Sequence, residues 1–124
     1  MTLFSPTVLE HFRRPRNHRR LEAPDVAEEA YNAVCGDRIR LELRFADGVV
    51  AEAAFRGDGC ALSIAAASLL TELLPGRTLA DAGALGDAEL LAALDATVPA
   101  SRLACALLPL RALRGGLAAR GAGA

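Results

Sequence analysis

The side chains best suited to metal or sulfur chemistry belong to Cys35, Asp37, Cys60 and Cys105. Thiolates and carboxylates are ordinary ligands of zinc, and cysteine is the standard ligand of iron–sulfur clusters. None of the cysteines lies in a Cys-x-x-Cys pair, and their separations match no common zinc module. A free cysteine on its own is usually a buried residue of the core. The elements that carry these side chains therefore decide between a shared site and unrelated core residues.

An alternating pattern predicts a β-hairpin between the first two cysteines. Apolar residues take every second position from Ile39 to Phe45 and again from Val49 to Phe55, with a turn signal at residues 46–48. A two-residue loop would place apolar residues opposite polar ones. A three-residue loop, with Gly48 in the left-handed conformation, keeps one face apolar throughout. We therefore expect the three-residue loop.

The expected register also brings potential ligands together. Continued along the strands, it sets Asp37 opposite Gly57 and Cys35 opposite Gly59, the neighbour of Cys60. Glycines permit a close approach of the backbone at these positions. The sequence thus predicts that two thiols and a carboxylate meet at one end of the hairpin.

Capping residues and apolar periodicity predict the helices. Ser5-Pro6 begins a short first helix that ends before Pro15, and Cys60 opens a largely buried helix closed by Pro75-Gly76. The later helices are expected over residues 78–85, over 87–96 with Asp87 as N-cap, and over 101–120 with Ser101 as N-cap. Strands near the front and helices behind them indicate an α+β domain spanning residues 1–124, with 121–124 as a disordered tail.

Pro109 bears on the environment of Cys105. In a continuous helix the amide of residue 109 would bond the carbonyl of Cys105, and proline has no such amide. Regular helix is therefore expected to begin close to Cys105, where the helix end would favour a thiolate. The alternative is a helix kinked at Pro109, with Cys105 simply buried.

Composition limits the functional classes. The chain has 124 residues, a net charge of −1 and 52% hydrophobic residues, which is typical of a globular domain rather than a nucleic-acid-binding one. The absence of a long apolar stretch, of a signal pattern and of an even cysteine count predicts a cytoplasmic protein with reduced thiols and no membrane contact. The arginine-rich connection over residues 15–24 is either a solvated loop or a docking patch for an acidic partner, through Arg16, Arg19 and Arg20. His11 and His18 are expected at the surface rather than as ligands.

Several segments resemble motifs of the IscU/SufU/NifU-type iron–sulfur scaffolds, in family order and over most of the chain. They are Glu10-His11-Phe12 with Pro15-Arg16-Asn17, Asn32-Ala33-Val34-Cys35-Gly36-Asp37-Arg38-Ile39-Arg40-Leu41, Gly57-Asp58-Gly59-Cys60 followed by Ser63-Ile64-Ala65 and Ala67-Ser68, and Arg102-Leu103-Ala104-Cys105-Ala106 followed by Arg111-Ala112-Leu113.

This resemblance implies an α+β fold with a small antiparallel sheet packed against several helices. It implies sulfur received from a pyridoxal-phosphate-dependent cysteine desulfurase and a transient [2Fe–2S] cluster that passes to apo iron–sulfur proteins. In the SufU-like branch, a bound Zn²⁺ serves sulfur transfer instead. Carried over by position, Cys35, Asp37, Cys60 and Cys105 would be the ligands, and Cys105 the acceptor of persulfide sulfur.

The chain also departs from the family pattern. Ala104 stands where the IscU branch has a histidine, and residues 98–102 lack the proline-rich, lysine-ended segment that the family's chaperone recognises. These departures argue against dependence on that chaperone. Three hypotheses remain open: a cluster scaffold, a zinc-dependent sulfurtransferase, and a structural metal-binding domain without sulfur traffic.

Overall fold

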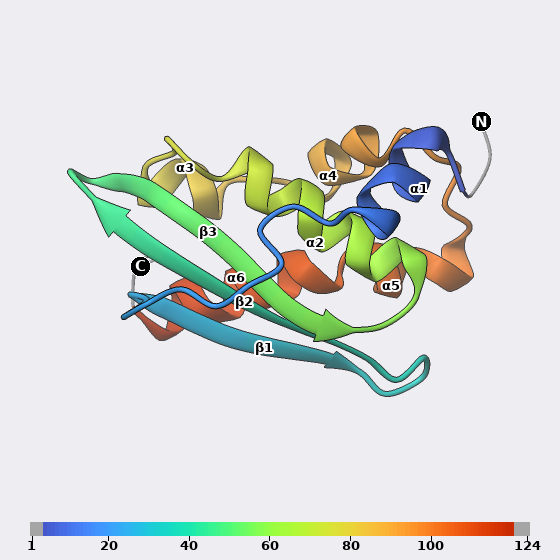
Figure 1. Ribbon diagram of the computed structural model, residues 1–124, viewed down its shortest axis with the longest axis horizontal. Helices are drawn as coiled ribbons and strands as arrows, with labels where there is room; N and C mark the ends of the chain where they lie inside the picture. Colours follow the sequence, from blue (N-terminus) through green and yellow to red (C-terminus); the bar gives the residue numbers. More distant parts are fainter. Residues whose placement is uncertain (1–3, 121–124) are drawn as a thin grey trace.

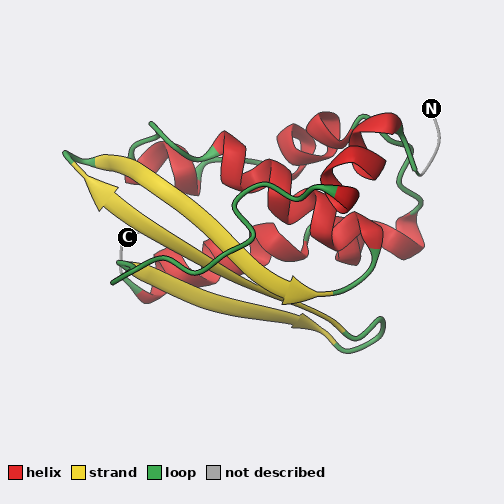
Figure 2. Ribbon diagram, in the orientation of Figure 1, coloured by secondary structure: helices red, strands yellow, loops and turns green. Residues whose placement is uncertain are grey.

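A computed structural model describes residues 4–120, in which a three-stranded antiparallel sheet carries helices on one face (Figures 1 and 2). The α+β prediction is confirmed. The elements are α1 (Pro6–Arg13), β1 (Val26–Asn32), β2 (Asp37–Ala46), β3 (Val49–Asp58), α2 (Ala61–Leu73), α3 (Leu79–Gly83), α4 (Asp87–Leu94), η1 (Ala100–Arg102), α5 (Leu103–Ala106) and α6 (Leu108–Ala119). No helix in this part of the chain is long and apolar enough to cross a membrane. The predicted tail 121–124 lies outside the described residues.

The first helix begins as its sequence predicts. The Ser5 hydroxyl accepts a hydrogen bond from the Val8 amide at 3.1 Å, and Pro6 occupies the first helical position. The same hydroxyl donates to the Leu94 carbonyl at 2.8 Å, so the cap also joins α1 to the end of α4. Ser5 therefore fixes both where the helix starts and where it docks.

The hairpin is confirmed, but the predicted loop is wrong. Ala46 pairs with Val49, so the loop has two residues, and Asp47 and Gly48 have positive φ angles of 55° and 79°. Asp-Gly is a favoured pair for such a turn. A β-bulge between Arg44 and Phe45 then shifts the pairing.

The bulge restores the apolar face that the two-residue loop alone would have lost. Beyond it, Leu43 pairs with Ala53 and Leu41 with Phe55, and these side chains are buried. The corrected register ends with Arg38 opposite Asp58, which brings Asp37 level with Gly59 rather than with Gly57. The carboxylate therefore lies closer to Cys60 than the predicted register would have placed it.

Strand β1 is a strand that the sequence did not predict. It pairs antiparallel with β2, and its pairs run from Val26 with Leu43 to Asn32 with Asp37. Glu28 faces the helix side of the sheet and interrupts the apolar alternation that would have revealed the strand. Glycines in α6 make room for it, because a Cβ at Gly116 would lie 2.5 Å from the Val26 side chain.

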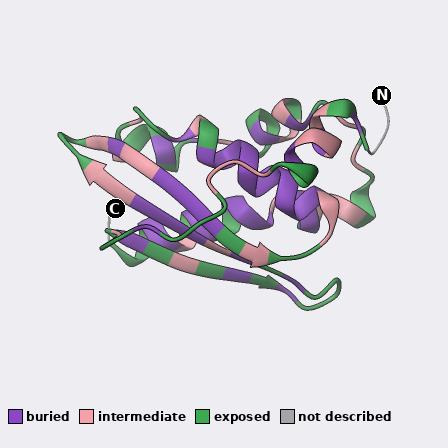
Figure 3. Ribbon diagram, in the orientation of Figure 1, coloured by how far each residue is buried: buried purple, intermediate pink, exposed green. Residues whose placement is uncertain are grey.

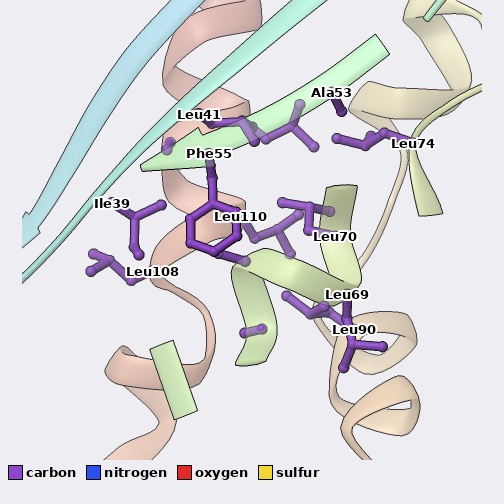
Figure 4. Packing of buried hydrophobic residues seen from close by; sticks show 14 of the residues in the cluster. Ile39, Leu41, Ala53, Phe55, Leu69, Leu70, Leu74, Leu90, Leu108 and Leu110 are labelled. Carbon is purple, nitrogen blue, oxygen red and sulfur yellow. The ribbon is translucent and has the colours of Figure 1, made fainter. Parts of the chain in front are cut away.

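The core lies between the sheet and helices α2 and α6. Burial is concentrated along α2 and on the strand faces that meet it (Figure 3). Phe55, Ile39, Leu70 and Leu110 gather at the centre of this packing (Figure 4), and each side chain is fully buried. Helix α2 is thus a central element, and Cys60 stands at its N-terminus.

The third predicted helix is confirmed in place, with Thr78 as the N-cap of α3, but the predicted caps of the later helices are wrong. Gly86 rather than Asp87 is the N-cap of α4, and Ser101 lies inside the 3₁₀ turn η1. The single helix expected over residues 101–120 is broken at Leu107 into α5 and α6, because Pro109 cannot continue the hydrogen-bond ladder.

Residues 15–24, which we call the strap, cross the outer face of the sheet (Figure 1). The Phe55 amide donates to the Asn17 carbonyl at 2.9 Å, which partners the edge of β3. Further along, the Leu21 amide donates to Glu42 Oε1 at 2.8 Å, and both residues are buried. The strap is therefore packed against the sheet and is not simply a solvated loop.

His11 is buried between the first two helices, so its predicted surface position is wrong. Its Nδ1 lies 2.7 Å from the Ser68 hydroxyl, and the residue is only 8% exposed. Burial lowers the pKa of His11 below 6.5, the nearby Arg16 lowers it further, and Glu72 and Glu10 oppose the shift. His18 is exposed, as predicted, and its ring stacks on the Phe55 ring.

We expect this histidine to make the fold less stable in mild acid. Because its pKa is lower in the folded than in the unfolded chain, the unfolded chain binds more protons below about pH 6.5. The free energy of unfolding should therefore fall as the pH drops from 7.5 to 5.5. In His11→Asn, which keeps a polar partner for Ser68, urea unfolding should show a smaller decrease. An equal decrease in both proteins would contradict the assignment.

Candidate thiol and metal site

The structure brings the first and last cysteines together with the aspartate. One ligand atom from each of Cys35, Asp37 and Cys105 lies within 4.8 Å of the other two. The Sγ atoms of Cys105 and Cys35 are 3.2 Å apart across a sequence separation of 70 residues. Cys60 lies outside this group of three, but its Sγ is 3.7 Å from Asp37 Oδ2.

Separate elements carry these side chains to one end of the molecule. Cys35 lies in the turn between β1 and β2, and Asp37 is the first residue of β2. Cys60 is the N-cap of α2, as its position in the sequence predicts, and Cys105 lies in α5. The exposure of the thiols decreases along the chain, from exposed Cys35 through half-buried Cys60 to buried Cys105.

Asp37 is the centre of the hydrogen-bond network. Its Oδ1 accepts the Cys60 amide at 3.0 Å and its Oδ2 accepts the Ser63 hydroxyl at 2.8 Å. Burial alone would raise the pKa of Asp37, but hydrogen bonds from Ser63, Cys105 and Cys60 outweigh it and hold the pKa below its usual value. The carboxylate is therefore anionic at neutral pH, as a metal ligand must be.

The environment of Cys105 differs from the predicted helix N-terminus. The sulfur is fully buried within the short helix α5, and regular helix resumes only at Leu108. Burial raises the pKa of Cys105 to about 12, with Cys35, Asp37 and Cys60 adding to the increase. The thiol is consequently protonated at neutral pH in this arrangement. The alternative of a buried Cys105 beside a proline break describes the helix better.

The pKa of Cys60 is shifted in the opposite direction, below its usual value. Burial alone would raise the pKa of Cys60, but the Ser63 amide, the Arg102 side chain and the Ser63 hydroxyl lower it overall. A thiol at a helix N-terminus is expected to ionise more readily for the same reasons. The site thus offers one easily ionised thiol beside a second that resists ionisation.

Sequence reasoning missed Ser63 as a site residue. Its hydroxyl lies 2.8 Å from Asp37 Oδ2 and 3.0 Å from the Cys105 carbonyl, so it joins β2, α2 and α5. That carbonyl is the group that Pro109 leaves without a helical amide partner. The only sequence signal for Ser63 was its place one helical turn after Cys60.

Arg102 and Asn32 were also missed. Interactions with the Cys60 and Cys105 sulfurs raise the pKa of Arg102, and its buried Nε has no hydrogen-bond partner among residues 4–120. Asn32, the last residue of β1, donates from its side-chain amide to the Cys105 sulfur at 3.7 Å. Neither role has a local signal, because both depend on which elements pack together.

The donor set suits a thiophilic metal. Three thiols and one carboxylate are sufficient for the tetrahedral coordination that zinc prefers, and thiolates also bind iron in clusters. The carboxylate is a harder and weaker ligand for iron than a fourth thiolate would be. The arrangement is therefore capable of holding a metal ion or cluster through a site with one readily exchanged ligand.

Comparisons with known proteins show the family to which the chain is related. The profile of the family described as "NifU-like N terminal domain" matches residues 3–120. A zinc-dependent sulfurtransferase, SufU of Bacillus subtilis, is 32% identical over 94% of this chain and 90% of its own length. The iron–sulfur cluster assembly scaffold protein IscU of Azotobacter vinelandii is 33% identical over 90% of this chain and 88% of its own.

Two further comparisons extend the relationship. The bifunctional protein NifU/MnmA of Rubrobacter xylanophilus is 37% identical over 89% of this chain, which spans only 23% of that longer protein. Among solved structures, a nitrogen-fixing NifU-like protein from Brucella abortus superposes with a TM-score of 0.78 at 20% identity, covering 98% of this chain and 96% of its own. At this identity, the similarity to the Brucella abortus structure shows a shared fold.

Proposed function

The chain belongs to the NifU-like N-terminal domain family, and from that membership we propose that it is an iron–sulfur cluster assembly scaffold. It receives sulfur from a cysteine desulfurase, holds a transient [2Fe–2S] cluster as its cargo, and passes the cluster to apo-proteins. The observation that supports this most is the convergence of Cys35, Asp37 and Cys105, with Cys60 in contact with the same carboxylate. In this proposal all four are ligands.

Cys105 is the proposed acceptor of sulfur. Its sulfur attacks the outer sulfur of the desulfurase persulfide; a new S–S bond forms as the old one breaks, and the desulfurase thiolate leaves without net oxidation. The proton on Cys105 must depart for this attack, because the thiolate is the nucleophile. A cation bound among the neighbouring ligands would supply the positive charge that favours this loss.

A second candidate is a zinc-dependent sulfurtransferase. It is supported by the likeness to SufU over nearly the full length of both chains and by Ala104, which is exposed where the IscU branch has a histidine. In this candidate Zn²⁺ stays at the site and only the persulfide on Cys105 moves on. The two candidates share their ligands and differ in what the site releases.

Anaerobic purification and reconstitution separate the candidates. A scaffold should take up iron and sulfide in the presence of a desulfurase, show visible charge-transfer absorption, and transfer the chromophore to an apo-ferredoxin. A sulfurtransferase should instead retain zinc and acquire only persulfide. A protein that binds metal but takes up neither sulfide nor persulfide would refute both candidates and leave a structural metal-binding domain.

Replacing Asp37 by alanine should slow the release of metal or cluster. The weak oxygen ligand is lost, so the remaining thiolates hold the cargo more firmly, and we expect transfer to slow by about tenfold, or about 1.4 kcal/mol in barrier height. The measurement is the rate of transfer to an apo-ferredoxin or to a chelator. Asp37→Asn keeps an acceptor for the Cys60 amide and controls for local unfolding. Unchanged rates in both variants would refute the role.

A further inference from the structure

A pocket on the outer face of the sheet is lined mainly by arginine. It has a volume of about 360 Å³ and lies between the strap and the outward-facing residues of all three strands. Its lining residues are His18, Arg20, Glu29, Arg38, Arg40, Arg56, Gly57 and Asp58, so four arginines face two carboxylates. We call this set the arginine pocket. It is locally cationic in a chain whose net charge is −1.

Two of these arginines form no ion pair within residues 4–120. Arg40 pairs with the buried Glu42 at 2.9 Å, and Arg38 lies 3.5 Å from Glu29. Arg20 and Arg56 are exposed and form no ion pair with any residue of the described chain. Exposed guanidinium groups without internal partners are well suited to bind carboxylates or phosphates from another molecule.

The arginine pocket lies directly behind the thiol site. Arg38 follows Asp37 on β2, and Asp58 ends β3 two residues before Cys60. The register places Arg38 and Asp58 opposite each other at the same end of the hairpin. A molecule bound at this pocket is therefore held next to the elements that carry the potential ligands.

We propose that the arginine pocket is a docking surface for an acidic segment of a protein that exchanges sulfur or a cluster with the thiol site. This inference rests on the proposed function. Pockets for small ligands are mostly apolar and enclose their ligand, whereas six of the lining residues here are exposed and nearly all are polar. Such a surface suits an extended, charged segment and accelerates encounter by electrostatic steering.

The structure also changes where the docking surface lies, compared with the patch that the sequence predicts in residues 15–24. Arg16 pairs with Glu10 at 3.2 Å and Arg19 pairs with Glu52 at 3.4 Å, so both charges are used inside the molecule. Only Arg20 of that set faces the pocket, where it joins arginines of β2 and β3. The docking surface is thus formed by the sheet, with the strap as one wall.

The test is an NMR titration of the ¹⁵N-labelled protein with a short peptide of alternating glutamate and aspartate. Binding should shift the amide signals of Arg20, Arg38 and Arg56, and it should weaken as salt is raised, because exposed charges are screened. In R20E/R56E the affinity should fall by about tenfold or more. R20Q/R56Q, which removes the charges without reversing them, should give an intermediate loss and covers the case in which charge reversal disturbs the fold.

The matched control is R13E/R111E, which changes the net charge equally at two exposed arginines of α1 and α6 that form no ion pair within residues 4–120. It should bind the peptide nearly as the wild type does. Equal loss in both double variants, or shifts confined to other surfaces, would overturn the proposal. So would pyrophosphate binding at the pocket without peptide binding, which would indicate a small-anion site.

A zinc titration of the wild-type protein in the same buffer separates this inference from the function beneath it. Zinc bound through the cysteines, together with no peptide binding, would refute the docking surface and leave the proposed function standing. Peptide binding at the pocket without any metal or persulfide at the cysteines would refute the proposed function. It would also remove the argument that the natural partner is a protein that exchanges sulfur or a cluster.

Discussion

Cys105→Ser should lose sulfur acceptance to the background level while the fold stays intact. The serine oxygen cannot form the S–S bond of a persulfide, and no other thiol has the proposed role. The substitution is nearly isosteric at a fully buried position, and Asn32 lies beside it to bond the hydroxyl, so the free energy of unfolding should fall by only about 1–2 kcal/mol.

The measurement is persulfide labelling after incubation with a cysteine desulfurase and cysteine. Peptide mapping of the wild-type protein is the internal control, because the transferred sulfur should be found on the peptide that contains Cys105. Undiminished labelling of the serine variant would remove Cys105 from its assigned role. Sulfur mapped to Cys35, only 3.2 Å away, would transfer that role to the neighbouring thiol.

The second large effect is expected at Gly57, where alanine should destabilise the sheet. A Cβ at this position would lie 2.1 Å from the Arg38 carbonyl oxygen and 3.0 Å from the Ile39 side chain. The first of these atoms belongs to the backbone of the adjacent strand, so relief requires β2 and β3 to separate. We expect a loss of about 3 kcal/mol in urea unfolding, the upper end of what overpacking usually costs.

Gly59→Ala is the informative comparison. Its Cβ would meet the Asp37 side chain, with Oδ1 at 2.9 Å, and not the backbone of a strand. We therefore expect a smaller loss of stability and a larger loss of metal affinity than in Gly57→Ala. Equal unfolding free energies for Gly57→Ala and the wild type would show that the strands accommodate the methyl group.

The fold was predictable where a local pattern matched the buried face. Ser5-Pro6 marks the start of α1, and the alternation in β2 and β3 identifies the hairpin. The register was not predictable in the same way, because a bulge can restore the apolar face after a two-residue loop. Strand β1 was missed because Glu28 occupies an inward position that only the glycines of α6 make available.

In the candidate site, too, some residues could be predicted from the sequence and others could not. Residue type identified the three thiols and Asp37, and the structure places Cys35, Asp37 and Cys105 together with Cys60 alongside. Ser63 and Arg102 could not be identified, since their contacts join elements that are distant in the sequence. The helix start predicted at Cys105 was wrong by a few residues, which changed the expected ionisation of its sulfur.

The contact between Cys35 and Cys105 has a consequence for protein synthesis. When synthesis has reached residue 60, the nascent chain contains Cys35, Asp37 and Cys60. Cys105 is added only after the three helices α2, α3 and α4. The hairpin contacts are local in the sequence, whereas the Cys35–Cys105 contact closes a loop of 70 residues and requires the end of that loop to be synthesised. The complete set of potential ligands therefore exists only after translation has passed α5, and any shorter nascent chain lacks the buried thiol of Cys105.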